Sequence, residues 1–137
     1  MTVPLPTTPV AGGGLGFGLR LSDGDLVVEN GALATVEGLP NLVQALTLRV
    51  RTPFGTDVFN TTYGFDAAGI FGQPVAARTV ADLIRLNLVR TLATDPRVRE
   101  VDDVVVTPGP DHRMWTAEVS IVTLDGRRES LPLRIEA

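Results

Sequence analysis

The sequence predicts an α+β fold: two main helices packed on a small mixed or antiparallel sheet, with β-hairpins toward both ends of the chain. Three observations predict this class. Two segments carry apolar residues at helical spacing, the last third alternates apolar and polar residues, and Asn-Gly and Asp-Gly pairs stand where hairpins would turn. With 137 residues, 44% of them hydrophobic, the chain is long enough to bury one core.

The first 18 residues are expected to form a flexible arm, followed by a single domain over residues 19–137. Prolines and a glycine cluster in this stretch disfavour both helix and strand. The glycine spacing is not that of a dinucleotide loop, and no Gly-Lys-Ser/Thr follows it. Neither a leader sequence nor an apolar run of membrane-spanning length is recognisable, so we expect cytosolic synthesis and no direct membrane contact.

Asn30-Gly31 predicts a β-hairpin over residues 25–35, because both residues of its tight turn need a positive φ. If these two residues form the loop, one face of the hairpin is apolar enough to sit on a core. The residue pairs expected across it are Val28 with Leu33 and Leu26 with Thr35.

Two amphipathic helices are expected, one from Leu39 to Arg51 and a longer one from Val75 to Thr94. Pro53 and Pro96 follow their ends, where proline disfavours further helix. The loop between the helices holds four aromatic residues and is expected to pack down. The buried stripes would be Leu39, Leu42, Val43, Leu46 and Val50 in the first helix, and Val80, Ile84, Leu88 and Leu92 in the second.

The last third is expected to form strands over residues 101–107, 114–124 and 131–135, with Asp125-Gly126 turning the final hairpin. Pro132 cannot donate to a strand ladder, so the last strand should lie at a sheet edge where another chain could add. Apolar residues alternate along these last two strands: Trp115, Ala117, Val119 and Ile121, then Leu131, Leu133 and Ile135.

Composition argues against several classes of function. A net charge of −4 disfavours a general nucleic-acid binder. The chain has no cysteine, and its single histidine, His112, has no second imidazole to share a metal or a proton relay. Glycoside hydrolysis needs two carboxyl groups in different environments, and none stands in an apolar, aromatic segment. We therefore assign no catalytic, metal-binding or cofactor-binding residue and expect a non-enzyme.

The segment Asp95-Pro96-Arg97 follows the longer helix and invites two interpretations. Proline could form a stiff, exposed corner that holds a carboxylate and a guanidinium on defined sides. The plainer interpretation is a helix stop with solvated charges, and local sequence alone favours it.

The order of these features resembles the baseplate wedge family of contractile phage tails, whose members are also called sheath initiators. Relatives occur in type VI secretion and other contractile injection systems. The resemblance covers residues 17–135. It is carried by the Gly24–Val28 hairpin segment, the first helix, Thr52 to Gly55, Tyr63-Gly64 and the long helix ending in Asp95-Pro96-Arg97.

The resemblance implies roles for particular residues. Thr52 and Gly55 match a threonine-glycine motif after the first helix, and Tyr63-Gly64 matches the family's tyrosine-glycine loop. Asp95-Pro96-Arg97 corresponds to a Glu-Pro-Arg motif that contacts the core helical bundle of the wedge, with the shorter aspartate replacing glutamate. The C-terminal hairpin, residues 115–123 and 129–135, would accept strands from the first sheath ring.

The implied function is a structural baseplate component that docks on the wedge and templates sheath assembly by strand addition. Its implied partners are the sheath protein and baseplate wedge proteins, with the tail tube or spike hub as further candidates, and six copies per ring. It would assemble in the cytoplasm as part of a virion tail or an intracellular injection particle. The alternative is a soluble regulatory module resembling a proteolysis anti-adaptor. Some relatives are labelled lysozymes, an activity these residues do not support.

Overall fold

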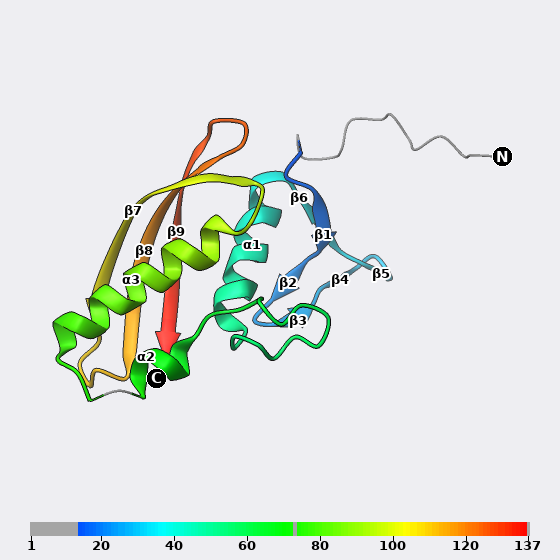
Figure 1. The fold of residues 1–137 in the computed structure, drawn as a ribbon. Helices are drawn as coiled ribbons and strands as arrows, with labels where there is room; N and C mark the ends of the chain where they lie inside the picture. Colours follow the sequence, from blue (N-terminus) through cyan, green and yellow to red (C-terminus); the bar gives the residue numbers. More distant parts are fainter. Residues whose placement is uncertain (1–13, 73, 137) are drawn as a thin grey trace. The chain divides into compact units, whose positions relative to one another are not determined.

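The computed structural model describes residues 14–72 and 74–136. The chain divides into two compact units, residues 1–44 and 45–137. Helix α1 (Gly38–Arg51) runs across the division. The elements confirm the α+β class, since helices and small antiparallel sheets occur in the same chain (Figure 1).

The N-terminal unit consists of three antiparallel two-stranded ribbons and the start of α1. The ribbons meet where Arg20, Val27 and Ala34 exchange backbone hydrogen bonds of 2.8–3.2 Å. The pairs are β1 (Phe17–Leu19) with β6 (Thr35–Glu37), β2 (Leu21–Ser22) with β3 (Asp25–Leu26), and β4 (Val28–Glu29) with β5 (Ala32–Leu33).

Residues 14–18, the described end of the expected N-terminal arm, lie against α1. Leu15 is only 1% exposed, and β1 already begins at Phe17. Asn41 of α1 donates from Nδ2 to the Leu15 carbonyl at 3.0 Å, and Gln44 Nε2 donates to the Leu19 carbonyl at 2.7 Å. These side chains hold the segment against α1. Residues 1–13 of the expected arm lie outside the described residues.

The first predicted hairpin is partly confirmed. Asn30 and Gly31 have φ values of 52° and 76°, and Val28 faces Leu33 as expected. The second expected pair is wrong, because the hairpin ends at Val27 and the residues beyond it pair with other strands. Leu26 faces Leu21, and Thr35 faces Leu19. Val28 is 65% exposed and Leu33 48%, so this face does not sit on a core.

The C-terminal unit is a three-stranded antiparallel sheet in the order β7-β8-β9, with α3 packed on β7 (Figure 1). Its elements are α2 (Ala67–Phe71), α3 (Ala77–Ala93), β7 (Val98–Pro108), β8 (Met114–Thr123) and β9 (Arg128–Glu136). The core comprises the predicted stripe of α3, Val80, Ile84, Leu88 and Leu92, and the alternating residues of β8 and β9.

The two long helices agree with the sequence, whereas α2 was not predicted. The connecting loop packs down only in part: Phe65 is 2% exposed, but Phe59 is fully exposed. Helix α2 follows Phe65 and is capped by Asp66, whose Oδ1 accepts a hydrogen bond from the Gly69 backbone at 2.9 Å. At five residues, α2 is too short for a hydrophobic period to show in the sequence.

Candidate functional site

The two loop motifs form one structure, because the segment after α1 runs beside the tyrosine-glycine segment. Pro53 and Phe65 form a parallel bridge, and the Phe65 backbone donates to the Thr52 carbonyl at 2.9 Å. Gly55 donates to the Tyr63 carbonyl at 3.3 Å. Gly64 has a φ of 112°, and a Cβ there would lie 2.5 Å from the Thr52 oxygen. The close approach of these segments therefore requires glycine.

A chain of contacts joins this loop pair to the end of α3. The Arg49 guanidinium lies over the Tyr63 ring, 4.7 Å from its centroid. Arg49 Nη1 also donates a short hydrogen bond to Thr94 Oγ1, beside Asp95. Arg49 and Thr94 were not predicted as site residues, since only the folded chain brings them to the motifs.

In the Asp95-Pro96-Arg97 bend, the carboxylate of Asp95 pairs with the guanidinium of Arg97. Asp95 is 2% exposed, and its carboxylate accepts bonds from Arg97 Nε at 2.9 Å, from Arg97 Nη2 at 2.7 Å and from the Arg97 backbone at 2.9 Å. Pro96 is exposed, and the Arg97 side chain is 25% exposed. Neither interpretation from sequence describes this bend in full. The carboxylate is not solvated, and only proline and part of arginine face outward.

The pKa of Asp95 reflects this pairing. Burial by itself would raise the pKa of the carboxyl group, but hydrogen bonds from the Arg97 side chain and backbone lower it below its ordinary value. The charges of Arg97 and Arg49 act in the same direction. Asp95 is therefore held ionised, which suits an internal anchor for Arg97.

Strand β9 lies at the edge of its sheet, as Pro132 predicted. The β8–β9 register is continuous, and the Thr123 backbone donates to the Arg127 carbonyl at 2.8 Å. Because backbone direction alternates along an antiparallel strand, the residues that face β8 are the odd-numbered ones. The backbone groups of the even-numbered residues, Arg128, Ser130, Pro132, Arg134 and Glu136, face the open edge.

The side chains predicted for strand addition are core residues. All of them are at most 3% exposed, so none can be reached directly by a partner. They are Trp115, Ala117, Val119 and Ile121 in β8, and Leu131, Leu133 and Ile135 in β9. What β9 offers to another chain is its backbone edge, which these side chains hold in place.

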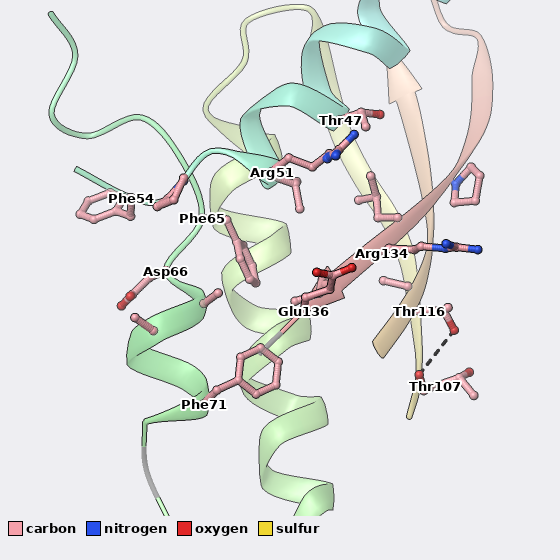
Figure 2. A pocket seen from close by; sticks show the side chains of 18 of the residues that line it. Thr47, Arg51, Phe54, Phe65, Asp66, Phe71, Thr107, Thr116, Arg134 and Glu136 are labelled. Carbon is pink, nitrogen blue, oxygen red and sulfur yellow. Dashed lines mark hydrogen bonds between the residues drawn. The ribbon is translucent and has the colours of Figure 1, made fainter. Parts of the chain in front are cut away.

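A groove of about 1320 Å³ adjoins the C-terminal half of β9. Figure 2 shows Phe65 and Phe71 pointing toward the end of β9 from one side, with Arg134 and Thr116 on the other. Val50 and Arg51 at the end of α1 also line the groove. Sequence reasoning missed it, although the aromatic residues of the connecting loop were a signal.

The described residues thus form a small α+β protein whose candidate sites are a self-paired bend and an open strand edge. The chain belongs to the contractile injection system sheath initiator family, whose family model matches residues 16–126. The family is structural, and its members are parts of phage tails or other contractile injection particles that associate with sheath and baseplate components.

A solved structure shares the fold. A protein from Geobacter sulfurreducens, described as a candidate tail lysozyme, is 16% identical with a TM-score of 0.61, over 82% of this chain and 96% of that one. No curated protein matches the sequence.

In the described part of the chain, no three His, Cys, Asp or Glu side chains could hold a metal ion. No helix there is long and apolar enough to cross a membrane.

Proposed function

We propose that this chain templates the contractile sheath by adding a strand of the sheath protein to β9. The observation that carries the proposal is the open edge of β9, which has backbone groups facing away from β8 over most of its length. Such an edge pairs readily with a foreign strand, and the family supplies the partner class. Six copies in a ring would multiply a modest single-site affinity.

Arg134 provides a test of this strand addition. Its backbone N–H faces the open edge, so Arg134→Pro removes one donor from the edge and leaves the bonds to β8 in place. Arg134→Ala is the matched control, because it removes the same side chain and keeps the N–H. We expect Arg134→Pro to abolish sheath initiation on purified baseplates, seen by electron microscopy, and Arg134→Ala, which loses only the side chain, to reduce initiation much less. Equal initiation by the two variants would contradict strand addition at this edge.

The bend supports a second contact, with the baseplate wedge. Asp95 is buried, so we propose that it anchors Arg97 and that exposed Pro96 and the outward part of Arg97 meet the core bundle of the wedge. Pro96→Gln changes this surface and leaves the ion pair intact. Pro110→Gln makes the same change at an exposed proline in the β7–β8 connection.

Incorporation into the baseplate, measured by quantitative mass spectrometry of assembled particles, should fall for Pro96→Gln and stay normal for Pro110→Gln. Normal incorporation of both variants would remove the bend from the wedge interface. Arg97→Ala is less informative, since it would leave the buried Asp95 carboxylate without its partner.

We also propose that the chain is not a lysozyme, despite the description of the similar structure. A glycosidase needs a carboxylic acid whose pKa is raised so that it can donate a proton. The buried carboxyl of Asp95 has its pKa lowered instead. Incubation with purified peptidoglycan should release no soluble fragments. Release that a single carboxylate substitution abolishes would overturn this proposal.

A further inference from the structure

The groove lies beside only part of the open edge. Among β9 residues it is lined by the last five, Pro132 to Glu136, and by none from Arg128 to Leu131. Pro132 also interrupts the row of donors that faces outward. An added strand would therefore meet both free backbone groups and a hollow for its side chains only from Pro132 onward.

The alternation of β9 determines where side chains of an added strand would point. Directly opposed residues of neighbouring strands place their side chains on the same face of the sheet. Partner residues opposite Leu133 and Ile135 would share the face on which these two are buried. On that face, Phe65 and Phe71 bound the groove (Figure 2). Apolar side chains are required there, because they would continue an apolar core.

The opposite face of the same segment is charged. Arg134 and Glu136 are exposed on it, and the groove is also lined by exposed Arg51. Neither Arg51 nor Arg134 takes part in an ion pair with another described residue. Asp66 and Glu118 line the groove as well, so its charge is mixed. The residue of an added strand directly opposite Arg134 would lie nearest that guanidinium, which favours an acidic residue at this one position.

Strand β7, at the other margin of the sheet, is less suited than β9 to pairing with an added strand. Strand β7 has register shifts between Val98 and Glu100 and between Val101 and Asp103. Irregularities of this kind hinder the pairing of an edge strand with another chain. Most of the residues that line the groove from the strands belong to β8 and β9, with Val105 and Thr107 the ones from β7.

We propose that the groove makes β9 selective: it accepts an extended sheath segment only along Pro132–Glu136. In that segment, the residues opposite Leu133 and Ile135 are bulky and apolar, and the residue opposite Arg134 is acidic. The inference rests on the proposed function for its partner. It adds the extent of pairing and the chemistry of the strand that is selected.

A proline scan of the open edge tests the extent of pairing. Binding of the sheath protein from the same particle would be measured for Ser130→Pro and Arg134→Pro, each against its own alanine variant. Both prolines fall at edge-facing positions, so both variants should fold. We expect Arg134→Pro to weaken binding about tenfold or more, and Ser130→Pro to stay within about twofold of Ser130→Ala.

The outcomes separate the two proposals. If Arg134→Pro and Ser130→Pro both weaken binding, the whole edge pairs, and the selective segment is wrong while strand addition stands. If neither weakens binding, strand addition at β9 fails and the proposed function fails with it.

The groove itself is tested by Phe71→Ser, which should weaken sheath binding about tenfold by removing an apolar wall. Because Phe71 is half-buried in α2, folding is checked by near-ultraviolet circular dichroism. Phe54→Ser provides a second variant, since Phe54 lines the groove and is 53% exposed. If both serine variants bind like the parent protein, the groove does not hold partner side chains.

Discussion

The bend after α3 and the margin of β9 are both candidate docking sites, but they differ in whether their polar groups are hydrogen-bonded within the sheet or bend. At the bend, each carboxylate oxygen of Asp95 accepts a hydrogen bond from the Arg97 side chain, and the backbone N–H of Arg97 adds another. At the margin, the outward backbone groups of β9 have no neighbouring strand in the described sheet. Charge marks the first site in the sequence, whereas proline marks the second.

This difference separates stability from binding. A buried carboxylate that is fully hydrogen-bonded is needed by the fold, since removing its partner or its charge leaves unpaired polar atoms in the interior. An open edge contributes little to the fold and is available to another chain. Substitutions of the buried Asp95 should therefore act mainly on the free energy of unfolding, and substitutions at the margin mainly on association.

The largest effect is expected for Asp95→Ala, which would remove the anchor of the bend. We expect a loss of about 2–3 kcal/mol in the free energy of unfolding, below the range for fully buried pairs because Arg97 is partly exposed. Urea denaturation followed by circular dichroism measures it. Asp102→Ala is the control: its ion pair with Arg128, at 3.1 Å, is exposed and should contribute less than about 1 kcal/mol. Equal losses in the two variants would show that burial of Asp95 has no special role.

A smaller effect is expected from acid. The pKa of Asp95 lies below its ordinary value of 3.8 in the folded chain, so the unfolded chain binds the proton more readily. The stabilisation is fully present above the ordinary value and is lost as pH falls through the lowered one. The free energy of unfolding should therefore decrease on acidification from about pH 5 to about pH 2.5.

Comparison with Asp95→Asn isolates this contribution. Asp111 and Asp125 also have a lowered pKa, but both variants retain them, so their contributions cancel in the difference. The gap in unfolding free energy between the parent and Asp95→Asn should narrow as pH falls. A gap that is independent of pH would mean that Asp95 does not titrate in this range.

Sequence reasoning succeeded where a local pattern determines the structure. The spacing of Val80, Ile84, Leu88 and Leu92 predicted the buried stripe of α3, and Pro132 predicted an edge strand, because both depend on a single element. Contacts between distant segments were not predictable in this way. Neither the parallel bridge that makes Gly64 necessary nor the stacking of Arg49 on Tyr63 has a periodic signature.

The N-terminal ribbons show the same limit. Asn30-Gly31 correctly predicted a turn and the Val28–Leu33 pair, two residues on either side of it. The next pair failed because Val27 bonds to Arg20 and Ala34 at a junction of three ribbons. A local turn signal carries no information about such a branch.

The smallest effect on stability, and the sharpest contrast with the bend, is expected for Pro132→Ala. The new N–H would face the open edge, so the free energy of unfolding should change by less than about 1 kcal/mol. The same N–H completes a row of donors, which should raise self-association through β9, measured by sedimentation velocity over a concentration series. Pro110→Ala is the control, at an exposed proline outside the edge. If Pro132→Ala associates no more than Pro110→Ala, the missing donor does not limit pairing, and the groove alone must account for any selectivity of the margin.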